Sequence, residues 1–249
     1  MSILMKGVHK AFGVNRVLKG FSLEVHQGET VAIVGQSGTG KSVALKHVVG
    51  LLKADEGEVW VDGKNVGEME LEELYDLRRN VGYVFQFAAL FDSLTIGENV
   101  GLGLQRIPEM TEDTISRRVR ECLALVELEG YEGRYPSQLS GGQKKRAGLA
   151  RAIATKPDYL LYDEPTTGLD PVTTTVIDRL IIRTREELEV TSVVITHDMY
   201  SAYRVADRIG MLYDGVIRFW GTPEEIQACA DPVVRGFIEG KPELLEGAG

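Results

Sequence analysis

The chain has 249 residues, of which 43% are hydrophobic and 26% are charged, and these fractions are ordinary for a globular protein with a sizeable core. Its formal net charge of −9 argues against a general binder of nucleic acids or anionic membranes, because phosphate-rich partners are normally met by a basic surface. The charge does not exclude ATP, because a nucleotide needs only a local site.

Cysteine usage and hydropathy indicate the compartment. Cys122 and Cys229 lie far apart in the sequence and in no metal-ligand spacing, so they predict neither a disulfide framework nor a zinc site. A reducing cytoplasm is therefore expected. The sequence has no apolar stretch of the roughly 18 residues that a membrane-spanning helix requires, and its N-terminal residues 1–6 lack a signal-peptide pattern. We expect that the chain does not span a membrane by itself.

The start of the chain is typical of an antiparallel β region. Strand-like patterns at residues 3–8 and 21–25 flank turn-forming residues at 13–16. Phe12 precedes this turn, where an aromatic face can stack on an adenine base. A core or hairpin aromatic is the alternative.

Residues 35–42 match the spacing G-x-x-x-x-G-K-[ST], after a β-branched strand pattern at 30–34 and before a helical pattern at 42–52. Glycines let successive backbone N–H groups point into one concavity, which accepts phosphate oxygens. Lys41 can place its ammonium on the β- and γ-phosphates, Ser42 can offer its hydroxyl to Mg²⁺, and the helix dipole adds positive potential. The flanking strand and helix disfavour a chance glycine-rich turn. The residues predicted to bind ATP here are Gly35, Gln36, Ser37, Gly38, Thr39, Gly40, Lys41 and Ser42.

The middle of the chain is predicted to change from strands to helices. Residues 57–63 and 81–85 have strand patterns, and Gln86 follows the second, where a side chain can project toward a nucleotide. From 87 to 154 the composition favours helices, which predicts a helical subdomain inserted into the sheet domain. The segment 88–96 is unusually apolar for a connection, which fits either a core edge or a surface for a partner.

A second glycine-rich segment, LSGGQ at 139–143, precedes a helix predicted to run through residue 153. Ser140 suits a helix N-cap, and Gly141 and Gly142 allow close backbone approach. The segment is therefore a candidate anion-binding helix start, and a plain capped helix is the alternative.

Two carboxylates end the predicted buried strand at 159–164. Asp163 can hold Mg²⁺ through water, and Glu164 can orient or deprotonate the attacking water. Residues 165–171 predict a stiff turn before a helix over 172–188, and the strand pattern at 192–196 ends at His197. That end of an α/β sheet is where ligands bind, so His197 can touch the γ-phosphate; a structural histidine is the usual alternative.

Together, GQSGTGKS at 35–42, Gln86, LSGGQ at 139–143, LLYDE at 160–164, GLD at 168–170 and His197 resemble the ATP-binding cassette family. The resemblance covers residues 1 to about 230. It implies an α/β P-loop nucleotide-binding fold with an antiparallel β subdomain and an inserted helical subdomain, at about 87–154 within an ATPase domain of residues 1–230. The tail at 231–249 is then a frayed end or an arm on a neighbouring subunit.

The resemblance also implies how ATP is bound and cleaved. In the family, ATP lies between the phosphate loop of one cassette and the signature segment of another, so a dimer, in the simplest case a homodimer, is expected. The implied catalytic residues are Glu164, His197, Gln86 and Lys41, and the implied Mg²⁺ ligands are Ser42, Gln86 and Asp163. ATP is further contacted by Phe12, Ser140, Gly141, Gly142, Gln143 and Asp170.

Within the family, residues 74–78, 85–86, 89–95, 221–226 and 233–240 resemble the ATPase subunit of bacterial phospholipid transporters of the Mla or Mce-associated type. The implied partners are an integral membrane permease, contacted by the segment after Gln86, an Mce-domain lipid-binding protein and a STAS-domain subunit. The implied location is the cytoplasmic face of the inner membrane. No nucleic-acid partner is expected.

Two alternatives remain open. An ATPase subunit of an importer for amino acids or other small solutes would share every catalytic motif and differ only in the permease-facing segment. A soluble cassette ATPase of DNA repair, chromosome maintenance or translation tends to carry two cassettes, coiled coils or zinc modules, and the sequence shows none of these.

Overall fold

The computed structural model describes residues 2–246. It divides into two compact units. The first combines the chain up to Tyr75 with the chain from Thr191 onward, and the second comprises Asp76–Val190. The chain leaves the first unit within helix α2 (Leu71–Arg79) and returns to it at strand β8 (Thr191–Thr196).

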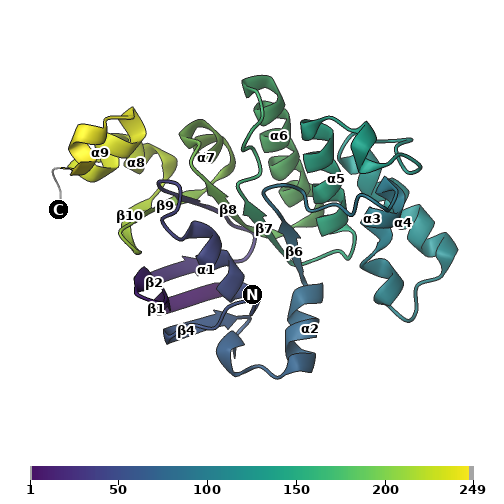
Figure 1. Cartoon of the computed structure of the whole chain (residues 1–249), viewed down its shortest axis with the longest axis horizontal. Coiled ribbons are helices and arrows are strands. Elements are labelled where there is room, and N and C mark those ends of the chain that lie inside the picture. Colours follow the sequence, from purple (N-terminus) through teal and green to yellow (C-terminus); the bar gives the residue numbers. More distant parts are fainter. Residues whose placement is uncertain (1, 247–249) are drawn as a thin grey trace. The chain divides into compact units, whose positions relative to one another are not determined.

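An antiparallel sheet in the first unit confirms the predicted β region. Its strand order is β2-β1-β4-β5, and Figure 1 shows β1, β2 and β4 side by side. The strands are β1 (Ile3–Phe12), β2 (Asn15–Val25), β4 (Glu56–Val61) and β5 (Lys64–Asn65). β1 and β2 are longer than expected, because pairing continues until Phe12 lies opposite Asn15. Register shifts along β1 interrupt the alternation of buried and exposed residues, which hides the full strand length in the sequence.

The other sheet of the first unit carries the strand that leads into the phosphate loop. Its order is β10-β9-β3-β8, with β3 (Thr30–Val34) between β8 and β9 (Arg208–Tyr213), and β10 (Val216–Gly221) at one edge. β3 is parallel to both neighbours. Every residue of β3 and β8 is buried, as expected for parallel strands covered on both faces.

Short helices complete the first unit. They are α1 (Lys41–Val48), η1 (Val66–Glu68), α7 (Met199–Val205), α8 (Pro223–Ala228), α9 (Pro232–Glu239) and α10 (Pro242–Glu246). The prediction that the helix after the phosphate loop reaches residue 52 is wrong. Gly50 adopts a left-handed φ of 62°, and the N–H of Leu51 turns back to the carbonyl of Lys46 at 2.9 Å, so the helix ends at Val48.

The tail is ordered over α9, so the expectation of a frayed end is wrong there. Asp231 caps the helix by accepting the N–H groups of Val233 and Val234. Both valines are fully buried in a core cluster that also contains Met211 and Ile226. Residues 247–249 of the predicted tail lie outside the described range.

The second unit contains a parallel pair of strands and most of the longer helices. Strand β6 (Val81–Val84) pairs with β7 (Tyr159–Asp163), whose residues are all buried. The helices are α3 (Ile96–Gly101), η2 (Leu104–Arg106), α4 (Glu112–Leu125), η3 (Pro136–Gln138), α5 (Gly141–Ile153) and α6 (Pro171–Leu188). The predicted class, α/β with an antiparallel sheet, is confirmed, whereas the boundaries 87–154 of a helical subdomain stay a prediction.

Across residues 2–246, no helix combines the length and the apolar character that crossing a bilayer would take.

Candidate active site

The phosphate loop follows β3 and ends where α1 begins, as the motif predicts. Gly40 is the N-cap of α1 with a φ of 102°, and a Cβ added there would lie 2.5 Å from a methyl carbon of Val17. At Gly35 a Cβ would lie 2.4 Å from the carbonyl oxygen of Leu212. Both contacts are far too short for a side chain, so these two positions require glycine.

Lys41 holds the loop in its curled shape. Its ammonium donates to the carbonyl oxygens of Gly35 at 2.8 Å and of Gln36 at 2.9 Å, and the side chain is buried. A buried ammonium within the loop also supplies the positive charge that phosphate oxygens need. Ser42, the next residue, is half-buried at the start of α1.

Parallel pairing brings two predicted elements to one edge of the sheet. Val34, the last residue of β3, lies opposite Thr196, the last residue of β8. The phosphate loop and His197 therefore leave the sheet at the same edge, which is the ligand-binding edge of open α/β sheets. His197 is exposed and precedes Asp198, the N-cap of α7.

A cavity of about 450 Å³ adjoins the phosphate loop within the first unit. Its size lies in the range of small-molecule sites. Phe12, the predicted adenine-stacking residue, is 48% exposed at the end of β1 but does not line this cavity. The lining residues are Asn15, Arg16, Val17, Gln36, Gly38, Thr39, Tyr213, Asp214 and Gly215.

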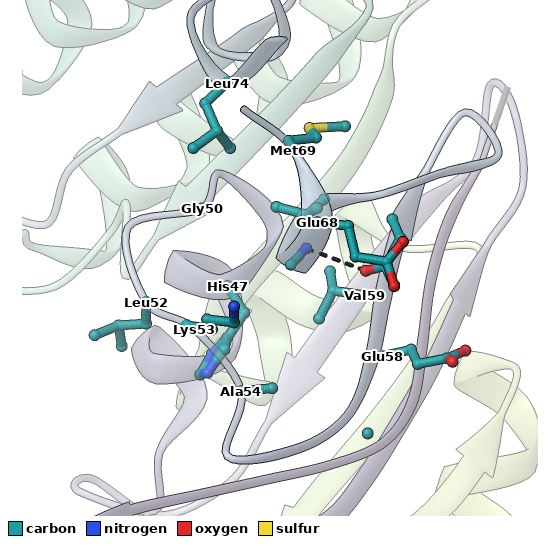
Figure 2. A pocket seen from close by; sticks show the side chains of 14 residues that line it. His47, Gly50, Leu52, Lys53, Ala54, Glu58, Val59, Glu68, Met69 and Leu74 are labelled. Carbon is teal, nitrogen blue, oxygen red and sulfur yellow. Dashed lines mark hydrogen bonds between the residues drawn. The ribbon is translucent and has the colours of Figure 1, made fainter. Parts of the chain in front are cut away.

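A second cavity, of about 520 Å³, adjoins the C-terminal end of α1 and the residues that follow it (Figure 2). Figure 2 shows Leu74 and Met69 at one end of it and His47 and Lys53 at another. The Nδ1 of His47 donates to the carbonyl of Val43 at 2.7 Å, and burial lowers the pKa of the imidazole. None of the predicted site residues lines this cavity, so it is separate from the predicted nucleotide site.

In the second unit, β6 and β7 bring the other predicted catalytic residues to one sheet edge. Val84 lies opposite Tyr162, so Gln86 and the pair Asp163 and Glu164 leave the sheet together. The hydroxyl of Tyr83 donates to Oδ2 of Asp163 at 3.0 Å. Burial and the neighbouring Asp163 carboxylate raise the pKa of Tyr83, so it stays a neutral donor that orients Asp163.

Glu164 is held in a specific conformation. It is 8% exposed and adopts a left-handed φ of 51°, which residues with a Cβ seldom do. The hydroxyl of Thr167 donates to its Oε2 at 3.0 Å. Unusual backbone conformations of this kind cluster at functional sites.

Lys145 of α5 contacts both the loop that contains Gln86 and the loop that contains Glu164. Its ammonium donates to the carbonyl oxygen of Gln86 and to that of Glu164, the latter at 3.3 Å. Burial lowers the pKa of Lys145, and the negative charges of Glu164 and Asp163 oppose that effect.

The signature segment forms a capped helix start. The hydroxyl of Ser140 accepts the N–H of Gln143 at 3.3 Å, and Oε1 of Gln143 accepts the N–H of Ser140 at 2.9 Å. Ser140 and Gly141 are exposed, whereas Gly142 packs so closely on α6 that a Cβ would lie 2.5 Å from Thr173. The exposed N–H groups of this helix start suit an anion brought by another molecule.

Asp170 has a local structural role. It is the N-cap of α6, where Oδ1 accepts the N–H groups of Val172 and Thr173 and Oδ2 accepts the Thr173 hydroxyl. The Thr173 hydroxyl and N–H hold the pKa of Asp170 below its ordinary value. The predicted contact of Asp170 with ATP stays a prediction.

Sequence reasoning missed Tyr83, Thr167 and Lys145. Tyr83 lies 80 residues from its partner Asp163, and Lys145 lies 59 residues from Gln86. No local pattern connects residues so far apart. Thr167 is only three residues from Glu164, and its place in the turn after the two acids was the one available signal.

The chain is similar in sequence to known proteins of one family. The family model described as "ABC transporter" matches residues 18–167. Protein TRIGALACTOSYLDIACYLGLYCEROL 3, chloroplastic, of Arabidopsis thaliana is 43% identical over 252 residues, covering 94% of this chain and 72% of the plant protein. The "Probable ribonucleotide transport ATP-binding protein mkl" of Mycobacterium leprae is 38% identical over 241 residues, covering 97% of this chain and 70% of its own.

A solved structure extends the likeness to three dimensions. The ATP-binding cassette MJ0796, in a dimeric post-hydrolysis state bound to ADP and Pi, matches with a TM-score of 0.81 at 37% identity. The match covers 89% of this chain and 98% of that chain.

Proposed function

Because this chain belongs to the ATP-binding cassette (ABC) transporter family and is an ATP-hydrolysing subunit of that family, we propose that it powers phospholipid transport through a separate membrane permease. One observation carries the lipid assignment. Over 94% of its length the chain is 43% identical to a plant protein whose name is that of a glycolipid.

ATP is bound by the phosphate loop, with Lys41 on the β- and γ-phosphates and Phe12 against the adenine. The curled loop and its buried ammonium support this assignment. Catalysis of phosphoryl transfer to water consists mainly of positioning and charge stabilisation. His197 supports the γ-phosphate, and its place at the same sheet edge as the loop favours that role.

Glu164 acts on the attacking water. As the water oxygen bonds to the γ-phosphorus, the bond to the bridging oxygen of ADP breaks and Glu164 takes the water proton. Thr167 orients the carboxylate by donating to Oε2. Gln86 positions the same water from the neighbouring strand end.

Mg²⁺ fits the donor set of Ser42, Gln86 and Asp163, which offers a hydroxyl, an amide oxygen and a carboxylate. Phosphate oxygens of the nucleotide would supply further ligands to the ion. When bound, the ion neutralises charge on the phosphates. Tyr83 keeps the Asp163 carboxylate in orientation.

Two copies of the chain form the active species. Ser140, Gly141, Gly142 and Gln143 of one copy contact the ATP held by the phosphate loop of the other. The exposed start of α5 and the dimeric state of MJ0796 support this arrangement. ATP binding completes the interface between the two copies and hydrolysis releases it, so each cycle of hydrolysis produces a movement of the two copies.

The permease docks on the segment after Gln86. Phe87 is 82% exposed and Phe91 is 53% exposed, and exposed aromatic side chains so close together are typical of a partner surface. The chain is therefore held at the cytoplasmic face of the membrane. An Mce-domain lipid-binding protein and a STAS-domain subunit belong to the same complex, on the resemblance of residues 74–78 and 89–95 to phospholipid transporters.

A second candidate is the ATPase subunit of an importer for a small solute. The name of the Mycobacterium leprae relative, at 38% identity, favours it. Mild-detergent copurification from the native membrane, with identification of proteins and extraction of lipid, separates the two. A permease with an Mce-domain protein and phospholipid supports lipid transport, whereas a permease with a solute-binding protein supports import.

A further inference from the structure

Lys145 is a buried lysine of the second unit that donates to two backbone carbonyls. It sits on α5, in the second turn after the signature segment, and is 8% exposed. A buried ammonium is costly unless it is hydrogen-bonded. Its acceptors are the backbone carbonyls of Gln86 and Glu164, the two residues assigned to the attacking water.

These acceptors lie on two separate loops. Gln86 follows β6 and Glu164 follows β7, and the two strands are adjacent and parallel. One ammonium that donates to both carbonyls fixes the distance between the two loops. A backbone carbonyl only accepts, so each contact with the ammonium is a charge-assisted hydrogen bond.

Both loops contain backbone that needs external support. Glu164 has a φ of 51°, and Ala88 and Ala89 have φ values of 59° and 49°. Such conformations persist when the surroundings fix them. Arg151, also on α5, donates to the carbonyls of Ala88 and Ala89, each at 2.6 Å. One helix therefore supports the Gln86 loop, and Lys145 extends that support to the backbone of Glu164.

We infer that Lys145 is a positioning residue for ATP hydrolysis, which holds the Gln86 loop and the backbone of Glu164 in one fixed arrangement. The inference rests on the proposed roles of Gln86 and Glu164. It assigns no contact between Lys145 and ATP. Its loss should therefore reduce turnover far more than nucleotide binding.

The test compares three variants in the full chain. Lys145→Met removes the donors and keeps the length of the side chain, Lys145→Arg restores donors, and Lys144→Met removes the same group one position along the helix. We expect Lys145→Met to lower kcat by about tenfold or more with KM for ATP changed by less than about threefold. Lys145→Arg should recover most of the loss, and Lys144→Met should match the wild type.

A second measurement does not depend on hydrolysis. Hydrogen exchange of the amides at 87–89 and 166–167 should speed up in Lys145→Met and stay unchanged in Lys144→Met. Unchanged exchange at both loops would overturn the inference, as would a fall in thermal stability with normal kcat. A wild-type chain without ATPase activity would refute the proposed function, while the exchange result would still decide the role of Lys145.

Discussion

Among single residues, Glu164 is the proposed general base of ATP hydrolysis. Its carboxylate accepts the Thr167 hydroxyl, and its backbone is held in a left-handed conformation at the end of β7. A general base must keep a fixed direction toward the water it deprotonates. The buried position and the Thr167 hydrogen bond supply that direction.

Glu164→Gln keeps the shape of the side chain and removes its basicity. We expect ATP binding to remain, hydrolysis to fall by about 100- to 10,000-fold, and an ATP-bound dimer to accumulate. Steady-state phosphate release and gel filtration with ATP measure the two effects. Glu186→Gln, the same change at an exposed position of α6, is the control. Retained turnover in Glu164→Gln would remove Glu164 as the base.

Glu29 makes a half-buried ion pair with Arg208 in the first unit. Arg208 donates to both carboxylate oxygens, through Nη2 at 2.6 Å in one case, and the N–H of His26 donates to Oε2 at 2.9 Å. Burial raises the pKa of Glu29, but Arg208 and the His26 N–H outweigh it, so the pKa lies below its ordinary value of 4.5. A carboxyl with a lowered folded pKa stabilises the fold above pH 4.5, and this contribution is lost as the pH falls through the folded value.

Glu29→Gln should therefore lower the free energy of unfolding by roughly 2 kcal/mol at pH 7. The difference between variant and wild type should shrink as the pH falls below 4.5. Urea unfolding at several pH values measures this. Glu187→Gln, which breaks an exposed pair with Arg183, should cost less than about 0.5 kcal/mol. A constant difference at every pH would contradict the pKa assignment.

The sequence predicted the place of a candidate site segment in the fold where its motif is continuous. The phosphate loop and the Asp163 and Glu164 pair could be located because a strand pattern directly precedes each of them. Lys145 and Tyr83 could not, because their contacts depend on the pairing of β6 with β7 and on the packing of α5. Burial of a lysine is not visible in a run of basic residues such as 144–146.

At the scale of elements, β3, α1 and β8 position the phosphate loop and His197, and β6, β7 and α5 position Gln86 and Glu164. Strand positions were predictable from buried β-branched runs. Element ends were less so. Helix α1 stops at Val48 because the chain turns at Gly50, and β1 reaches Phe12 because its pairing with β2 continues through shifts in register. The first end depends on a backbone conformation and the second on strand pairing, and neither leaves a local pattern in the sequence.

Helix α9 was not predicted as a packed element, and its docking can be tested directly. Val234 is fully buried in the core cluster beside Met211 and Ile226. Val234→Ala should lower the free energy of unfolding by about 2 kcal/mol, because two buried methyl groups are lost and a small cavity remains. Val172→Ala, at a 75% exposed position, should change it by less than about 0.5 kcal/mol. Equal effects in denaturant unfolding would mean that α9 does not pack in solution.

In the whole molecule, the proposed mechanism places each ATP between two chains. A mixture of Lys41→Ala and Ser140→Asp chains tests this. Asp at position 140 keeps the helix cap but repels phosphate, and Ala at position 41 removes the ammonium. The mixed dimer should contain one intact composite site and one site damaged on both sides.

Each variant alone should lose ATPase activity, and the equal mixture should regain up to roughly a quarter of the wild-type rate, since half of the dimers carry one intact site. Phosphate release and ATP-dependent dimerisation are measured on the same samples. The shared-site account fails if no mixture, at any ratio, forms an ATP-driven dimer.

ATP hydrolysis by this chain is proposed to move phospholipid. The most direct measurement reconstitutes the copurified complex of the chain and its permease in liposomes, and follows a fluorescent phospholipid with and without ATP. Phospholipid transfer that needs ATP, and that the complex carrying Glu164→Gln does not support, is the predicted result. ATP hydrolysis that proceeds with no lipid transfer and is stimulated by a small solute would contradict the claim and favour the importer.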